Sequence, residues 1–243
     1  MLPMPMPEAN PATRQGTVES LPAVATAVPI RRRRGYEAIK RLLDLVVSTA
    51  VMALLSPLFA AIALAIKLDS AGPIFFVQDV VGKDGNVFRM PKFRSMHPGS
   101  NNRAHEACLA RNVLQSAAPM IDNSGRPIFK TALLNAKNIT RVGRLLRKTS
   151  LDELPQLWCV VVGDMSLVGP RPSLPTEVAL YQDWQLERLT VRPGLTGLYQ
   201  VEARNCVPVE EMVRLDVQYV RKRSLALDLA ILVRTPLAMF KGM

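Results

Sequence analysis

Residues 45–66 constrain this chain most, because no charged residue interrupts them. As an α-helix rising about 1.5 Å per residue, the segment would be roughly 33 Å long, enough to cross the apolar core of a bilayer. Pro57, near its centre, lacks the backbone donor that a continuous helix needs, so we expect the helix to break at Ser56 and Pro57. The hydroxyl of Ser56 can then bond to a carbonyl oxygen that the break frees.

Basic residues lie on both sides of this apolar segment. Those before it are residues 31–34, Lys40 and Arg41, and those after it are Lys67, Lys83, Arg89, Lys92 and Arg94. Because basic residues near a membrane segment favour the cytoplasmic side, both ends are expected on that side. A re-entrant helix-break-helix over residues 34–68 satisfies both flanks. An ordinary kinked span with an incomplete charge signal is the alternative, and the residues alone leave both open.

The charge and composition of the 243 residues limit the classes of partner. A net charge of +11 predicts an acidic partner such as nucleic acid, anionic lipid or a phosphorylated substrate. Aromatic residues make up only 5% and no recognition motif is present, which argues against nucleic acid. The three cysteines are far apart and form no CxxC pair, so we expect a reducing compartment. Residues 1–33, rich in proline and alanine and ending in basic residues, predict a disordered tail.

A small β-hairpin is expected just after the apolar segment. Residues 74–78 and 87–90 are short apolar runs that flank the turn sequence GKDGN at residues 82–86. Lys92 and Arg94 follow, on either side of Phe93, and form either a solvated edge or an anion site. Residues 97–138 are irregular, and we expect a loop there with one short helix near residues 104–117.

Two acidic residues follow a basic helical segment at residues 140–149. Ser150 and Glu153 have the spacing of a capping box, so one interpretation is that Ser150 begins a helix and Glu153 serves only as its cap. The other is that Asp152 and Glu153, surrounded by cations, form a metal and phosphate site. Arg171 raises a similar choice. Its flanking prolines hold it rigidly, which suits either bidentate phosphate binding or a structural ion pair in a buried turn.

The C-terminal part predicts further helices. Residues 177–189 and 210–222 have helical patterns, and residues 191–201 suggest a loop with a short strand. Residues 225–233 are apolar apart from Asp228, which suits either an interfacial amphipathic helix or a core helix. The expected fold class is α+β. Its expected units are the tail at residues 1–33, the membrane helix at 34–68 and a catalytic domain at 69–243.

Several motifs in a fixed order carry a family resemblance. They are KRLLDL at 40–45, Ser56-Pro57, KLDSAGPIFFVQ at 67–78, KFRSM at 92–96, ITRVGRLLRKTSLDELPQLW at 139–158, GDMSLVGPRP at 163–172, RPGLTGL at 192–198 and RLD at 214–216. The chain resembles the bacterial sugar transferases, the monotopic polyprenyl-phosphate phosphoglycosyl transferases. The resemblance favours the re-entrant topology and implies a helical catalytic domain on the cytoplasmic face of the bacterial inner membrane.

The resemblance also implies a reaction. Such enzymes transfer a sugar-1-phosphate from a UDP-sugar to undecaprenyl phosphate, giving undecaprenyl-diphosphate-sugar and UMP, with Mg²⁺ and a covalent phosphosugar-aspartate intermediate. This reaction begins exopolysaccharide, capsule or O-antigen (lipopolysaccharide) synthesis. The implied partners are UDP-sugar, undecaprenyl phosphate, inner-membrane lipids and downstream glycosyltransferases. A homodimer is left open, and nucleic acid is not expected.

The same resemblance assigns roles to residues of this chain. Asp152 would be the nucleophile and a metal contact, and Glu153 would assist through the metal or as acid or base. The implied phosphate-binding residues are Arg147, Arg171, Lys92 and Arg94, and Ser56 and Pro57 would set the membrane break.

The chain departs from the family pattern in places that leave some questions open. It has LYQVEARN at 198–205 where members often have LWQVSGRN, and residues 97–138 match poorly, so the sugar is not indicated. We expect a short form of the family, without the additional N-terminal membrane helices of longer members. A non-catalytic, membrane-anchored scaffold or regulator that retains the fold is the alternative function.

Overall fold

The computed structural model describes residues 34–99, 120–121, 127–128, 138–203 and 207–241. Its secondary structure is mixed, with helices around short two-stranded sheets, which confirms the expected α+β class. The expected tail at residues 1–33 and the expected short helix near 104–117 lie outside the described residues.

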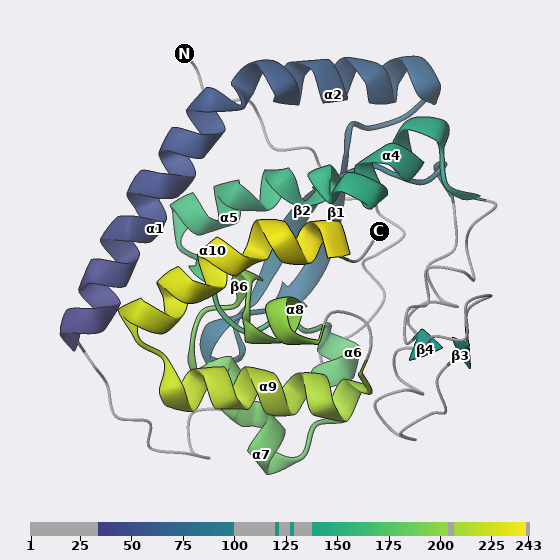
Figure 1. Cartoon of the computed structure of the whole chain (residues 1–243). Coiled ribbons are helices and arrows are strands. Elements are labelled where there is room, and N and C mark those ends of the chain that lie inside the picture. Colours follow the sequence, from purple (N-terminus) through teal and green to yellow (C-terminus); the bar gives the residue numbers. More distant parts are fainter. Residues whose placement is uncertain (1–33, 100–119, 122–126, 129–137, 204–206, 242–243) are drawn as a thin grey trace.

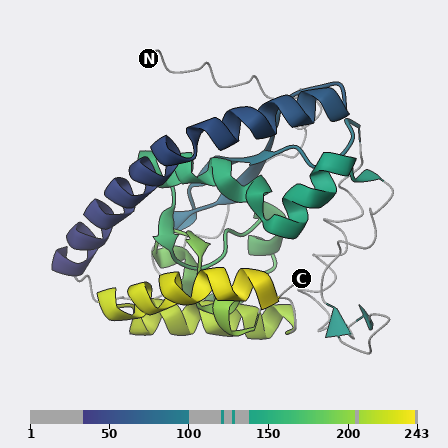
Figure 2. The same ribbon diagram turned by 45° about the horizontal axis from the view of Figure 1, so that its top comes forward.

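The predicted helix break is confirmed. Helices α1 (Arg34–Leu54) and α2 (Ser56–Asp69) meet at an angle of 60° and form one bent rod along an edge of the molecule (Figures 1 and 2). At the break the hydroxyl of Ser56 donates to the carbonyl oxygen of Ala53 at 2.9 Å, as its position predicts. Within the described residues no individual helix has the length and apolarity for a membrane crossing, but the bent pair taken together does, judged by length and composition only.

Helix α1 packs on the rest of the molecule through its polar residues. Asp44 is 3% exposed and accepts a hydrogen bond from the backbone N–H of Leu167 at 3.0 Å. Arg41 donates to the carbonyl oxygens of Val160 (2.5 Å) and Val161 (2.7 Å), the last carbonyls of helix α5. The large apolar side chains of α1 that face outward are Ile39, Leu42, Leu43, Leu45, Val46, Val47 and Leu54. Near the end of α1, Val51 and Met52 also pack against the main core, so the helix turns a mostly polar face to the protein and an apolar face outward.

The predicted hairpin is also confirmed, and it is longer than the sequence indicated. Strands β1 (Phe75–Val81) and β2 (Val87–Phe93) pair antiparallel, joined by a 3₁₀ turn, η3 (Lys83–Gly85). Asp84 (φ 56°) and Gly85 (φ 82°) in this turn have positive φ, which suits an Asp-Gly pair. Two smaller pairs exist, the parallel strands β5 (Ser166–Val168) and β6 (Gly194–Thr196), and the antiparallel strands β3 (Met120–Ile121) and β4 (Pro127–Ile128).

The expected capping box at Ser150 is wrong. Helix α4 (Arg141–Thr149) is capped by the Thr140 hydroxyl, which accepts from Gly143 N–H at 2.9 Å, and Ser150 ends this helix in the left-handed conformation, φ 56°. No side-chain capping bond starts the following 3₁₀ segment, η5 (Leu151–Gln156), which continues into helix α5 (Leu157–Val162). Ser150 thus both ends α4 and stands at the N-cap position of η5, so a helical segment does begin at the acidic pair, but without the expected side-chain cap.

The continuous helix expected over residues 177–189 is wrong as well. The segment divides into α6 (Pro175–Val178), α7 (Asp183–Leu186) and the 3₁₀ turn η6 (Glu187–Thr190). Side chains start separate turns here, since Glu177 accepts from Leu174 N–H at 2.8 Å and Gln185 from Gln182 N–H at 2.7 Å. Such local side-chain bonds compete with a continuous helical ladder.

Three helices follow in the C-terminal part. They are α8 (Leu198–Glu202), α9 (Val209–Lys222) and α10 (Leu225–Lys241), of which α9 was predicted closely. In α10, Ile231 is 1% exposed, whereas Leu229, Val233 and Leu237 are each more than half exposed. Helix α10 is thus buried on one side only.

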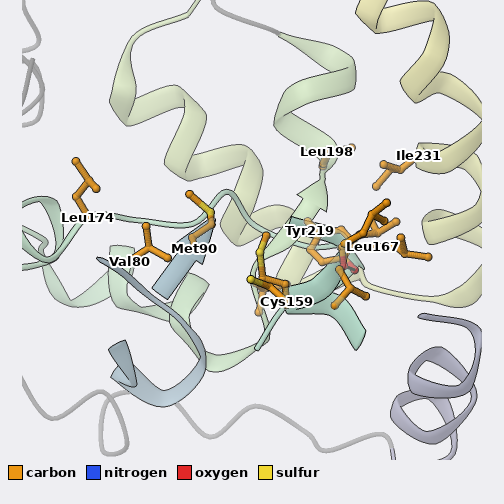
Figure 3. Packing of buried hydrophobic residues seen from close by; sticks show 13 residues of the cluster. Val80, Met90, Cys159, Leu167, Leu174, Leu198, Tyr219 and Ile231 are labelled. Carbon is orange, nitrogen blue, oxygen red and sulfur yellow. Dashed lines mark hydrogen bonds between the residues drawn. The ribbon is translucent and has the colours of Figure 1, made fainter. Parts of the chain in front are cut away.

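The main core lies between the hairpin, α5, β5, α9 and α10. Figure 3 shows Val80 and Met90 from the hairpin near Cys159, with Leu167, Tyr219 and Ile231 packed beside them. A second cluster joins α2 to the hairpin and α4 through Ile66, Phe93 and Leu146. The hairpin therefore contributes to both clusters, and its second strand carries Lys92 between them.

Candidate active site

The acidic pair lies beside two of the cations expected near it. Asp152 and Glu153 belong to η5, and η5 packs against strand β2. Lys92 Nζ, on β2, lies 3.7 Å from Glu153 Oε1. Arg147, in the last turn of α4, is held by a 2.8 Å bond from its Nε to the hydroxyl of Ser95. The positive charges of Lys92 and Arg147 both act on Asp152. Four sequence-predicted residues thus converge from three elements.

Burial raises the pKa of Asp152 to about 6, and the neighbouring charge of Glu153 adds to this rise. The positive charges of Lys92 and Arg147 lower the pKa of Asp152, but they do not cancel the rise that burial and Glu153 cause. At neutral pH the Asp152 carboxylate is ionised yet poorly hydrated. A desolvated carboxylate next to cations is suited to act as a nucleophile toward a phosphate group.

A pocket opens next to this pair. Its wall includes Lys92, Glu153 and Arg171. Its other lining residues are Gln78, Val80, Met90, Gln156, Pro172, Leu174, Gly194, Leu195 and Gln200. Asp152 precedes Glu153 in η5 without lining the pocket itself. The pocket combines cations, a carboxylate and three amides, which are the groups that bind phosphate and sugar hydroxyls.

The loop that carries Arg171 is fixed by a buried ion pair. Asp216, fully buried in α9, accepts from Arg171 N–H at 3.2 Å and pairs with Arg188. Arg188, which is 1% exposed, also donates to the carbonyl oxygen of Arg171 at 2.8 Å. Both backbone polar groups of Arg171 are therefore held by one ion pair.

The Arg171 side chain forms one of the two interactions that the sequence left open, the ion pair, and remains accessible for the other. Its Nη1 lies 3.7 Å from Oε1 of the buried Glu177, so it does form a structural ion pair. The side chain also remains 36% exposed and lines the pocket. A guanidinium has five N–H donors, so one carboxylate neighbour leaves donors for a phosphate.

Two glycines bring the Arg171 loop against the strand that completes the pocket. Gly169 N–H donates to Thr196 O at 2.9 Å, and Gly194 N–H donates to Pro170 O at 2.8 Å. A Cβ atom at either glycine would collide with the backbone of the other segment. The GPRP and RPGLTG motifs are thus halves of one packed unit.

The remaining sequence-predicted residues lie elsewhere. Arg94 is 6% exposed and donates to the carbonyl oxygen (2.6 Å) and hydroxyl (2.8 Å) of Ser70, in the turn after α2. It does not line the pocket, so it braces the turn between the membrane-like helices and the hairpin. Ser56 and Pro57 form the break between α1 and α2, also outside the pocket.

Sequence reasoning missed the residues that support the site. Arg188, Glu177 and Asp216 lie in no local pattern of catalytic residues, although Asp216 belongs to the RLD motif. Gln156 is 4% exposed and lines the pocket, but its position in LPQL carries no chemical signal. These groups are recognised only from their burial and their partners.

No cluster of three or more His, Cys, Asp or Glu residues within the described part of the chain could hold a metal ion. The adjacent pair Asp152 and Glu153 remains, with Glu153 42% exposed at the pocket. Mg²⁺ commonly binds through one or two carboxylates together with substrate phosphates and water. The acidic pair is compatible with such a site.

Comparison with known proteins gives a consistent result. A family model described as "Bacterial sugar transferase" matches residues 35–242. The chain is 40% identical to the undecaprenyl-phosphate galactose phosphotransferase of Salmonella typhimurium over 203 residues, which cover 84% of this chain and 40% of the relative. It is 37% identical to the exopolysaccharide production protein ExoY of Rhizobium meliloti, covering 81% of this chain and 83% of the relative.

A third relative is the UDP-glucose:undecaprenyl-phosphate glucose-1-phosphate transferase of Escherichia coli. It is 34% identical over 212 residues, which cover 84% of this chain and 40% of the relative. The chain therefore spans about two fifths of the length of several curated relatives, and most of the length of ExoY.

Proposed function

The chain belongs to the bacterial sugar transferase family, and from this premise we propose that it transfers a sugar-1-phosphate from a UDP-sugar to undecaprenyl phosphate. The products are undecaprenyl-diphosphate-sugar and UMP. The proposal rests on one observation. The Asp152 carboxylate interacts electrostatically with Lys92 and Arg147, and it lies beside a pocket that Arg171 lines. Relatives named for galactose and glucose phosphotransfer to undecaprenyl phosphate support the substrate classes.

The proposed chemistry has two steps. An Asp152 carboxylate oxygen attacks the sugar-bearing phosphorus of the UDP-sugar, the bond from that phosphorus to the bridging oxygen breaks, and UMP leaves. A phosphate oxygen of undecaprenyl phosphate then attacks the same phosphorus and releases the Asp152 carboxylate. Lys92, Arg147 and Arg171 hold the phosphate oxygens and stabilise the charge that develops on them.

Asp152 and Glu153 are the residues that would hold Mg²⁺. The bound ion would supply positive charge to the phosphate oxygens. Lys92 keeps the Glu153 carboxylate close to β2, and Ser95 orients Arg147. The acidic pair and its cations are therefore positioned by the fold before substrate arrives.

The surface of α1 and α2 supports a monotopic membrane location on the cytoplasmic face of the inner membrane. Helix α1 buries Asp44 and exposes several leucines. A helix on the surface of a water-soluble protein has the opposite pattern, with apolar residues buried and charged residues exposed. A bent pair that enters and leaves by one face would bring the candidate site to the depth of the lipid phosphate. Cysteines introduced at Arg34 and Asp69 test this topology: both should react with impermeant maleimide only after cell lysis, and opposite accessibilities would contradict the re-entrant form.

The reaction is tested by UMP release from the full chain in detergent, with undecaprenyl phosphate, Mg²⁺ and a panel of UDP-sugars. Asp152→Asn should abolish release, whereas Asp183→Asn, the same change at an exposed carboxylate, should leave it intact. Release with one sugar identifies the substrate. A folded wild type that releases no UMP with any sugar would favour the scaffold alternative.

The covalent step has its own measurement. Without undecaprenyl phosphate, the enzyme should release about one UMP per active site and gain the mass of one phosphosugar. UMP release that requires the acceptor from the first turnover, with no mass gain, would replace the two-step reaction by direct transfer.

A further inference from the structure

A second pocket lies at the N-terminal end of α1, apart from the candidate active site. It is bounded by α1, η3, β5, the residues that follow η6, and the end of α9. Its charged lining residues are Lys40, Arg41, Lys83, Arg192 and Arg223, against Glu37 and Asp44. Cations therefore outnumber carboxylates in its wall. The proposed transfer reaction uses none of these residues.

Most of these charges are already engaged by the fold. Lys40 Nζ lies 2.9 Å from Asp228 Oδ2, and Arg41 donates to the carbonyls at the end of α5. Arg223 donates to the Val220 carbonyl at 2.6 Å and lies 3.9 Å from Glu37. These contacts join α1 to α9 and α10, so they build the walls of the pocket.

Two cations in the wall are engaged weakly or not at all. The carboxylate paired with Lys83 is that of the exposed Asp84, at 3.9 Å, and such pairs contribute little. The exposed Arg192 side chain forms no hydrogen bond or ion pair with any other described residue. The pocket thus presents two positive charges that the rest of the described chain does not neutralise.

A buried hydroxyl in the same wall also lacks a partner. Ser166 is 2% exposed, it lines the pocket, and its Oγ has no hydrogen-bond partner among the described residues. Leaving a buried hydroxyl unsatisfied is costly. An anionic oxygen in the pocket would accept from this hydroxyl and from the two cations.

The pocket also borders an exposed apolar surface. Ile39 and Leu43 come three residues after the pocket-lining residues Tyr36 and Lys40 on α1, so they are neighbours on the helix surface, and each is 50% exposed. On the outer side of α10, Leu229 is 63% exposed. Figures 1 and 2 both place this end of α1 near the start of α10. A ligand with a phosphate in the pocket could therefore lay apolar chains on these side chains.

We propose that this pocket binds a phosphate group, and that the phosphate belongs to the headgroup of an anionic phospholipid. Lys83, Arg192 and Ser166 would contact the phosphate, while the leucines of α1 and α10 would contact the acyl chains. The site is separate from the acidic pair, so the lipid would bind the enzyme without being its acceptor substrate.

Binding of short-chain lipids to the full chain in detergent tests the proposal. Dihexanoyl-phosphatidylglycerol should bind measurably by calorimetry, while dihexanoyl-phosphatidylcholine and glycerol 3-phosphate should bind much more weakly. Lys83→Gln with Arg192→Gln should weaken phosphatidylglycerol binding by about 30-fold, the effect of two cations near an anionic headgroup. Lys83→Arg with Arg192→Lys should retain binding.

A matched control distinguishes binding at this pocket from a general attraction of the anionic lipid to the positively charged protein. Arg144→Gln with Lys148→Gln removes the same charge from exposed positions on α4, at the other end of the α1–α2 rod (Figure 1). If this control weakens binding as much as the pocket variant does, or if phosphatidylcholine binds equally, the proposed site is overturned. Glycerol 3-phosphate that binds as tightly as phosphatidylglycerol would support the phosphate pocket and overturn the lipid as its source.

Discussion

Asp152→Asn should make the protein more stable while it removes activity. Burial raises the pKa of Asp152 from an ordinary value of 3.8 to about 6, so the folded state binds its proton more tightly than the unfolded state does. Ionising this carboxyl at neutral pH therefore costs folding free energy, and asparagine removes the charge at nearly constant volume.

The size of the gain follows from the shift. A rise from 3.8 to about 6 corresponds to roughly 2–3 kcal/mol at neutral pH, allowing for the partial exposure of the group. For a chain of 243 residues this is on the order of a 5–10 °C rise in Tm. The cost is fully present above about pH 6 and disappears as the pH falls toward 3.8, because the group is then protonated in both states. Near pH 4 the gain should shrink to under about 1 kcal/mol.

Thermal and denaturant unfolding of both proteins in one detergent, at pH 7.5 and pH 4, measures this difference. Asp183→Asn is the control, because an exposed carboxylate carries no comparable burial cost. Equal stability of Asp152→Asn and wild type at pH 7.5, or a gain that does not change with pH, would refute the argument that Asp152 is a desolvated charge.

Three other results are expected. The value of kcat/KM should fall about tenfold per pH unit below about pH 6, because protonated Asp152 is not a nucleophile; a profile flat to pH 4.5 would exclude this role. Asp216→Asn should destabilise the fold by roughly 3–5 kcal/mol in denaturant unfolding, since Arg188 keeps a buried charge without its partner. Gly194→Ala should reduce activity strongly, because its Cβ would meet the backbone of Gly169 and displace the Arg171 loop; wild-type kinetics in this variant would contradict the close packing.

Local sequence signals predicted the elements whose causes are local. Pro57 removes a backbone donor wherever it stands in a helix, so the break could be located without a structure. The Asp-Gly turn at residues 84–85 determines a hairpin because few residue pairs tolerate two positive φ angles. The acidic pair, Lys92, Arg147 and Arg171 were also identified from the chain alone, through motifs that resemble a family.

Local patterns were insufficient where the conformation or the partner of a residue depends on parts of the chain outside its own motif. Ser150 does precede a 3₁₀ segment, but it takes a left-handed conformation that ends α4, and its side chain makes no capping bond to η5. The family resemblance placed Arg94, within KFRSM, among the implied phosphate-binding residues, whereas in the structure it does not line the pocket. Arg94 lies just past the end of β2, and its buried guanidinium donates to Ser70 in the turn after α2, a partner that no local pattern indicates.

The sequence by itself determined the helix break, the hairpin and the excess of positive charge, because these depend on residue type and short spacing, and its family resemblance singled out the candidate carboxylates. Only the tertiary structure decided which side of α1 faces the protein, how Arg188 and Asp216 hold Arg171, and how burial sets the pKa of Asp152. Those properties depend on solvent exclusion and on pairs of charges far apart in the chain, and neither is encoded in any local pattern.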